Sequence, residues 1–204
     1  MPTSIPIQAV IFDIGGVLVR TTDLEPRRRW DRRFGLPDWG VAKIVFESPA
    51  AAAATVGQAD LEAVWAAAGR ALNLPPADLA ALRADFWRGD VYDHALLAYI
   101  RALRPRYRTA IISNAWPETR AQHAPHINAE TFDLILYSAE EGVAKPAPAI
   151  YQRALERLGV PAAAAVFVDD MPENVAAARA LGLAGVRFQP DMDLPAEFAA
   201  LGIH

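Results

Sequence analysis

Asp13 is a carboxylate placed at the end of an apolar run. The surrounding sequence reads AVIFDIGGV, so β-branched residues lead into the acid and two glycines follow it. Such a run predicts a buried strand that carries the acid to the edge of a sheet, beside backbone free to approach a ligand. A carboxylate there can ligate a metal, or attack phosphorus and become an aspartyl-phosphate. Capping a helix or forming a turn is the alternative role, and the strand and glycines weigh against it.

Ser113 and Asn114 end a second apolar run, TAII. Both residue types favour turns, and taken alone they indicate no more than that. Beside Asp13, however, they offer a hydroxyl and an amide that can hold a phosphoryl oxygen.

Lys145 lies in the segment GVAKPAPAIY. A single lysine is usually a surface residue. Here Pro146 biases the backbone of Lys145 toward an extended conformation, and Pro148 can begin the helix that follows. A lysine fixed in this way can neutralise clustered carboxylates and a bound phosphate.

Asp169 and Asp170 end a further apolar run, AVFV, and Asn174 follows four residues after Asp170. Adjacent acids after a buried strand repel each other unless a cation lies near them. Magnesium prefers oxygen ligands and usually keeps waters beside one or two carboxylates. Capping of a helix that begins near Pro172 is the alternative for Asp170 or Asn174, but it explains one acid and not both.

The elements that must position these residues alternate along the chain. Regular alternation of strands and helices predicts an α/β fold with a doubly wound parallel sheet. Strands are expected at 8–13, 108–113, 133–137, 165–169 and 184–188, and helices at 93–104, 116–123, 147–158 and 172–181. Ligands bind beyond the carboxyl ends of the strands in such sheets, which is where the polar residues fall.

The interval 20–90 interrupts this alternation and contains no convincing strand. We expect helices at 23–34, 39–53, 59–72 and 77–87 there, with proline breaks between them. The predicted organisation is a core domain of residues 1–19 and 91–204 with a small helical cap, residues 20–90, inserted after the first strand. An insertion leaving at that point would lie over the ligand-binding edge.

Composition narrows the classes of function. The net charge of −4 gives no general attraction to nucleic acid or to an anionic membrane, and the absence of cysteine excludes disulfides, thiolate metal sites and cysteine nucleophiles. The four histidines are too far apart in sequence to suggest a histidine metal site. Residues 1–9 contain neither a signal peptide nor a membrane span, so we expect a cytoplasmic protein. Its oligomeric state stays open between a monomer and a homodimer.

Together the segments FDIGGV, ISN, KP and VDD with Asn174 resemble, in their order, the haloacid dehalogenase-like (HAD) superfamily, and residues 20–90 resemble its C1 cap. The resemblance implies a Rossmann-like core and a phosphatase that acts on a small phosphorylated metabolite with Mg²⁺. Asp13 would be the nucleophile and a metal ligand, and the metal would also bind the Gly15 carbonyl and Asp170. The phosphoryl group would be bound by Ser113 and the amide of Asn114, while Lys145 balances charge and Asp169 and Asn174 shape the metal site.

Gly15 departs from the family pattern. Family phosphatases usually carry there a second aspartate, which protonates the leaving group and then activates water, an effect worth typically 10²–10⁴-fold. Asp23 is the nearest acid downstream that could replace it. A leaving group that needs little protonation, as in a sugar 1-phosphate or an acyl phosphate, is another solution.

Three functions therefore stay open. The leading one is the Mg²⁺-dependent phosphatase, and a phospholigand-binding protein without turnover is the second. A metal-independent 2-haloacid dehalogenase is the third, although the Asp169–Asp170 pair would repel its carboxylate substrate.

Side chains of the cap would select the substrate. The run RRRWDRR at 27–33 could bind an anion, but a solvated helix face is the favoured interpretation because surface charge runs are common. The residues that we consider as candidates to face the pocket are Arg27, Trp30, Arg33, Trp39 and Lys43. For each of them the alternative is a side chain packed in the interior or exposed on the surface.

Overall fold

A computed structural model describes residues 5–204, so the first four residues of the N-terminal segment considered above lie outside the described residues. Its centre is a five-stranded parallel sheet with the strand order β5-β4-β1-β6-β7. This arrangement confirms the predicted α/β class. The strands are β1 (Ala9–Phe12), β4 (Arg108–Ser113), β5 (Leu134–Tyr137), β6 (Ala165–Asp169) and β7 (Ala184–Arg187).

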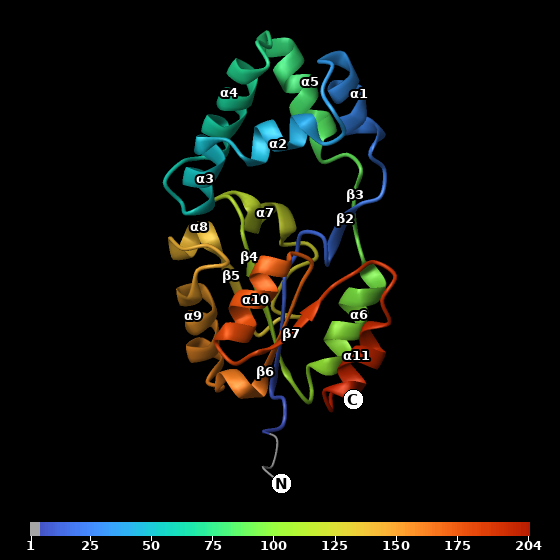
Figure 1. Cartoon of the computed structure of the whole chain (residues 1–204), viewed down its shortest axis with the longest axis vertical. Helices are drawn as coiled ribbons and strands as arrows, with labels where there is room; N and C mark the ends of the chain where they lie inside the picture. The colour runs from blue at the N-terminus through green and yellow to red at the C-terminus, as the bar shows by residue number, and fades with distance from the viewer. Residues whose placement is uncertain (1–4) are drawn as a thin grey trace.

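Helices cover both faces of the sheet (Figure 1). Val10 and Phe12 pack on the side of α6 (His94–Leu103) and α11 (Leu194–Ala200), while Ala9 and Ile11 pack on the side of α9 (Pro148–Leu158) and α10 (Pro172–Ala180). The alternation follows because successive side chains of a strand point to opposite faces. Being buried on both faces, β1 is apolar throughout.

The strand register brings the polar strand ends together. Phe12 of β1 lies opposite Ile111 of β4 and Val168 of β6, and the Asp13 N–H donates to the Val168 carbonyl at 2.9 Å. Asp13 is therefore level with Asp169 and close to Ser113, at the carboxyl edge of the sheet.

Five of the six helices between β1 and β4 pack around a core of their own, which includes Trp30, Trp65 and Phe86. They form a unit beyond the carboxyl edge of the sheet (Figure 1). The helices are α1 (Glu25–Arg33), α2 (Gly40–Phe46), α3 (Pro49–Thr55), α4 (Leu61–Ala71) and α5 (Pro76–Phe86).

The single helix predicted at 39–53 is wrong, because the chain forms two helices there, α2 and α3. Ser48 separates them: its side chain accepts a hydrogen bond from the Ala51 N–H at 3.0 Å, and Pro49 begins α3. A serine N-cap followed by proline at the first helical position is a helix start signal, and here it outweighs the helix propensity of the alanines.

Two short strands at the junctions between the helical unit and the sheet also went unpredicted. β2 (Val19–Thr21) and β3 (Asp90–Tyr92) pair antiparallel, with Val19 opposite Tyr92 and Thr21 opposite Asp90. Three residues are too few to display an alternating pattern, so only the pairing of distant segments reveals them.

The remaining elements are short. α7 (Thr119–His123) begins three residues later than expected, because Trp116 to Glu118 form the turn before it. The other short elements are α8 (Ser138–Glu141) and a 3₁₀ turn at Ala162–Ala164. The C-terminal tail finishes the core, since Phe198 and Ile203 are buried. None of the helices within residues 5–204 has the length and apolar character needed to cross a bilayer.

Candidate active site

Lys145 joins two carboxylates at the carboxyl edge of the sheet. Its Nζ lies 2.8 Å from Asp13 Oδ1 and 2.7 Å from Asp169 Oδ2, and all three residues are buried. A buried ammonium between two carboxylates is strongly held because little solvent screens the interaction.

Asp169 is saturated with hydrogen bonds. Its Oδ1 accepts from the Met171 N–H at 2.8 Å, and the Asn174 Nδ2 lies 3.1 Å from both carboxylate oxygens. Asn174 is itself fixed by the Tyr151 hydroxyl, which donates to the Asn174 carbonyl at 3.0 Å. With Lys145 as a further donor, the lone pairs of Asp169 are largely used within the protein.

Asp13 is bonded on one oxygen. The Ile14 N–H donates to Oδ1 at 2.7 Å, the same oxygen that contacts Lys145. Within residues 5–204 every hydrogen bond and ion pair of this carboxylate falls on Oδ1, which leaves Oδ2 for a ligand or a reacting atom.

Asp13, Asp169 and Asp170 each offer an oxygen within 4.8 Å of the other two, a set that could hold a metal ion. Burial raises the pKa of Asp13 above its ordinary value, with Lys145 opposing the rise and Asp169 adding to it. Burial and the charge of Asp169 raise the pKa of Asp170 as well. One lysine thus does not balance the cluster, and a divalent cation with oxygen ligands fits it.

Gly16 makes room for Asp170. Its φ is +72°, and a Cβ on Gly16 would lie 2.2 Å from Asp170 Oδ2. Only glycine satisfies both the backbone conformation and the close approach. Glycine is therefore required on steric grounds at position 16, the second of the two adjacent glycines.

Ser113 is buried at the end of β4. The Asn114 side chain bonds to the backbone of Lys145 in both directions, donating to its carbonyl at 2.9 Å and accepting from its N–H at 2.8 Å. The side-chain amide of Asn114 thus positions the backbone of Lys145.

A cavity of about 950 Å³ separates the sheet edge from the helical unit. Gly15, Ser113 and Asp170 line it from the sheet side, and Arg27 and Trp39 line it from the helical side. A volume of this size holds a ligand well beyond a phosphate ion.

The candidate residues of the helical unit divide between the cavity, the core of that unit and the surface. Arg27 and Trp39 line the cavity, whereas Trp30 is buried in the core of the helical unit. Arg33 is an exposed partner of Asp78, and Lys43 is exposed and does not line the cavity. The run at 27–33 is thus a solvated face, with the exception of Arg27 and of the residues packed in the core of the helical unit.

Three aromatic residues of the cavity wall, Phe46, Trp87 and Trp116, were not anticipated. They lie far apart in sequence and carry no local motif. Each of them lies at or near the end of a helix. That position is too common in a sequence to identify them as cavity residues.

Gly15 lines the cavity, and a Cβ placed on it would meet no atom within 4 Å. Asp23, the acid considered as a replacement, is exposed at the start of α1, where its carboxylate accepts from the Glu25 N–H at 2.9 Å. It does not line the cavity.

Three of the four histidines gather around Tyr92. The His126 ring is centred 4.0 Å from that of Tyr92, and His123 Nδ1 is hydrogen-bonded to the Tyr92 hydroxyl. His123 lines the cavity, and burial lowers its pKa, which favours the neutral ring. In the described part of the chain the aspartate cluster, and no histidine group, has the spacing of a metal site.

Curated relatives include a sesquiterpene phosphatase of Aspergillus oryzae, 28% identical over 181 residues that make up 88% of each chain. Acyl-CoA dehydrogenase family member 10 of Mus musculus is 32% identical over 76 residues, 37% of this chain and 7% of that protein. Haloacid dehalogenase-like hydrolase domain-containing protein 3 of Danio rerio is 46% identical over 55 residues, 26% of this chain and 23% of that protein. The matches thus span a small part of the mouse and zebrafish proteins and most of the fungal one.

Two solved structures show the same fold. A HAD family enzyme of Bacteroides thetaiotaomicron, in complex with magnesium and inorganic phosphate, superposes with a TM-score of 0.77 at 18% identity, covering 94% of this chain and 99% of that one. L-2-haloacid dehalogenase of Xanthobacter autotrophicus, with chloropropionic acid covalently bound, gives a TM-score of 0.64 at 23% identity, covering 97% and 84%.

The family model of haloacid dehalogenase-like hydrolases matches residues 7–182, from the strand that carries Asp13 to just past the end of α10. Since that span holds most of the chain, including Asp13, Lys145 and the Asp169–Asp170 pair, the protein belongs to the haloacid dehalogenase-like hydrolases.

Proposed function

We propose that this hydrolase is a Mg²⁺-dependent phosphatase, which cleaves a small phosphorylated metabolite through an aspartyl-phosphate on Asp13. The observation that carries the proposal is the Asp13 carboxylate, bonded through Oδ1 to Ile14 and Lys145 with Oδ2 left for a reacting phosphorus. The fungal relative is named a phosphatase, and the Bacteroides enzyme was solved with magnesium and phosphate, which supports the same chemistry.

The residues divide the reaction between them. Asp13 Oδ2 attacks phosphorus, the bond from phosphorus to the leaving oxygen breaks, and the leaving oxygen takes a proton from water in the cavity. Water then cleaves the aspartyl-phosphate, which releases inorganic phosphate and restores Asp13. The Ser113 hydroxyl and the Asn114 backbone N–H bind the phosphoryl oxygens, and Lys145 balances their charge.

Asp13, Asp170 and the Gly15 carbonyl are the residues we assign to Mg²⁺. Asp169 and Asn174 support them, consistent with the saturated hydrogen bonding of Asp169. When bound, the ion neutralises the charge that develops on the phosphoryl oxygens.

Residues 20–90 act, in this proposal, as a C1-type cap on a core of residues 1–19 and 91–204. The separate hydrophobic core of the five helices and the two-stranded β2–β3 junction support this division. A unit joined by two short strands can move as a body relative to the sheet.

Gly15 is the observation that favours a second function, the binding of a phosphorylated ligand with weak turnover or none. No carboxylate stands at this position, and Asp23 does not line the cavity to replace it. We therefore expect slow hydrolysis of esters whose leaving group needs a proton, and faster hydrolysis of acyl phosphates.

Phosphate release from a panel of phosphorylated metabolites and acetyl phosphate, with Mg²⁺ and with EDTA, tests the assignment against an Asp13→Asn control. Release that requires both the metal and Asp13 is the expected result. Metal binding without release from any substrate would favour the binding protein, and chloride release from 2-chloropropionate in EDTA would favour a dehalogenase.

A further inference from the structure

Aromatic side chains form the wall of the cavity opposite the carboxylates. Phe46 and Trp87 of the helical unit meet Trp116 of the sheet domain, with ring centroids 5.7 Å apart for Phe46–Trp116 and 6.2 Å for Trp87–Trp116. Phe46 and Trp87 nevertheless remain 46% and 40% exposed. We call these three residues and Trp39 the aromatic wall. Apolar surface left open toward a cavity indicates a binding surface, because exposing it to water is unfavourable.

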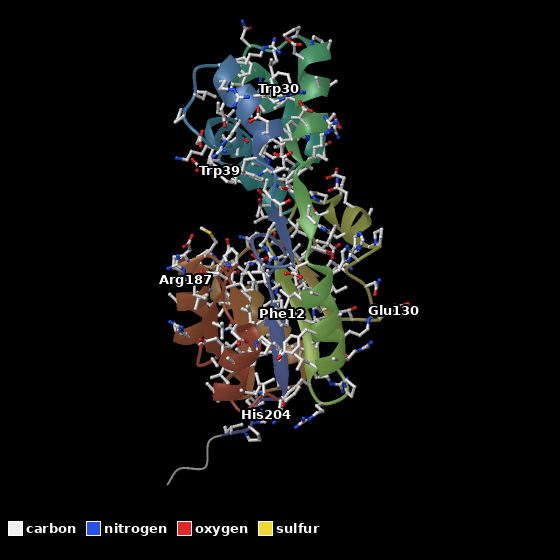
Figure 2. All side chains as sticks on the ribbon, turned by 90° about the vertical axis from the view of Figure 1, so that its right-hand side faces the viewer. Phe12, Trp30, Trp39, Glu130, Arg187 and His204 are labelled. Carbon is white, nitrogen blue, oxygen red and sulfur yellow. The ribbon has the colours of Figure 1, made fainter. Side chains whose placement is uncertain are left out.

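Trp39 is held in the cavity wall by an unusual backbone. Its φ is +69°, a left-handed conformation that bulky residues rarely adopt, and its side chain is 45% exposed. Buried Asp31 fixes the turn, accepting from the Trp39 N–H at 3.2 Å and the Val41 N–H at 2.7 Å. In Figure 2, Trp39 lies nearer to the sheet domain than Trp30, which packs inside the helical unit. Strained backbone that persists at a cavity points to a functional constraint on that side chain.

The positively charged side chains around the wall are already paired. Arg27 donates from one guanidinium nitrogen to both Asp90 oxygens, at 2.8 and 3.0 Å, and from Nε to the Phe86 carbonyl at 2.6 Å. Arg20, the other arginine of the lining, is paired with Asp93. Among the described residues that line the cavity, no arginine or lysine is therefore left unpaired to bind a second anionic group of a ligand.

The phosphoryl end and the wall belong to the same cavity. Ser113 and Asp170 line it together with Trp39, Phe46 and Trp87. A molecule whose phosphate contacts Ser113 and Asp170 can therefore extend the rest of its body along the aromatic side chains.

We propose, resting on the function above, that the substrate is the monophosphate of a bulky, uncharged, apolar alcohol or acid, whose apolar body packs on the aromatic wall. Substrates with a second phosphate or carboxylate bind poorly, because the wall gives that charged group no free cationic partner and desolvates it. Aromatic side chains at the wall also favour stacking with a flat or unsaturated body.

The affinity of non-hydrolysable alkylphosphonates, measured by calorimetry with Mg²⁺, tests this independently of turnover. Each buried methylene should tighten binding about fourfold at full burial. We expect octylphosphonate to bind at least ~100-fold more tightly than methylphosphonate. By contrast, 3-phosphonopropionate should bind more weakly than butylphosphonate. Equal affinities along the alkyl series, or tighter binding of the carboxylate, would overturn the proposal.

Variants locate the apolar subsite. Trp39→Ala and Trp87→Ala should each reduce the ratio of methyl- to octylphosphonate dissociation constants about tenfold, whereas Leu201→Ala, a comparably exposed apolar truncation at the end of α11, should keep it. Circular dichroism establishes whether each variant is folded. The alkylphosphonate affinities of the wild-type protein test the proposal even if one variant does not fold. Unchanged ratios in both tryptophan variants would place the tail elsewhere and overturn the assignment.

Acetyl phosphate separates this proposal from the proposed function. Hydrolysis of acetyl phosphate without any preference for longer phosphonates would support the phosphatase function and overturn the apolar substrate class. Tight binding of octylphosphonate without hydrolysis of acetyl phosphate would leave the apolar site and remove the phosphatase.

Discussion

The backbone of Gly16 touches the carboxylate of Asp170 so closely that a Cβ on Gly16 would lie 2.2 Å from Oδ2. Gly15, the preceding residue, has nothing within 4 Å of its corresponding position. Two adjacent glycines thus have opposite steric surroundings. One is required by the geometry of the carboxylate cluster, and the other leaves open space in the cavity.

Gly16→Ala should therefore abolish metal binding while Gly15→Ala keeps it. The new methyl group displaces Asp170, and the positive φ of Gly16 adds roughly 1–2 kcal/mol of backbone strain. Calorimetric titration with Mg²⁺ measures the effect, and thermal melting confirms that both variants are folded. Equal Mg²⁺ affinity in the two variants would mean that Asp170 is not a ligand.

Gly15→Asp should raise the hydrolysis of alkyl phosphates on the order of 10²-fold, since a positioned acid protonates the leaving oxygen. The open space at Gly15 admits the side chain. Initial rates for an alkyl phosphate and for acetyl phosphate make the comparison, because the acyl phosphate needs little protonation and should gain less. Gly15→Asn is the matched control without an acid. An equal gain in both variants would assign the effect to packing.

Asp13→Asn should stabilise the metal-free protein at neutral pH. Burial, partly opposed by Lys145, raises the pKa of Asp13 from 3.8 to about 6 in the folded protein. The unfolded chain then binds fewer protons between these two values, so wild-type stability falls as pH rises through this window. Melting curves in EDTA should show the Asp13→Asn variant melting on the order of 5 °C above the wild type at pH 7.5, with the gap closing toward pH 3.8.

The control for that measurement is Mg²⁺. Added metal should raise the melting temperature of the wild type at pH 7.5 and should have little effect on the Asp13→Asn variant. A gap in EDTA that stays constant from pH 4 to 7.5 would show that the titration of Asp13 is not its cause.

Asn114→Ala should release the segment that carries Lys145. Two hydrogen bonds between the Asn114 side chain and the Lys145 backbone are lost, which costs roughly 1–3 kcal/mol of unfolding free energy. Urea denaturation measures the loss, and phosphate release should fall with it as the ammonium moves away from Asp13. Asn128→Ala, which removes one exposed turn contact, is the control. Loss of stability with unchanged turnover would mean that Lys145 keeps its position without these two hydrogen bonds.

Several features of the fold and the site were predictable because they depend on the pattern of residues within short segments of the chain. The apolar runs before Asp13, Ser113 and Asp169 fix buried parallel strands, and the carboxyl ends of such strands must meet at one edge. The sequence alone therefore determined the α/β class and the convergence of its polar strand ends. It also indicated an aspartate cluster suited to a divalent cation.

Other features were decided by tertiary structure, because they join residues far apart in the chain. Nothing local distinguishes Arg27 from the other arginines of its run, yet its pairing with Asp90, 63 residues away, takes it into the cavity wall. Likewise β2 and β3 exist only through their mutual pairing. Trp39, Trp87 and Trp116 come from three separate segments that line one cavity, and the turn at Trp39 is held by the carboxylate of Asp31. The sequence thus determined the carboxylate end of the cavity, whose residues end regular strands, while the aromatic wall depended on how the inserted helices pack against the sheet edge.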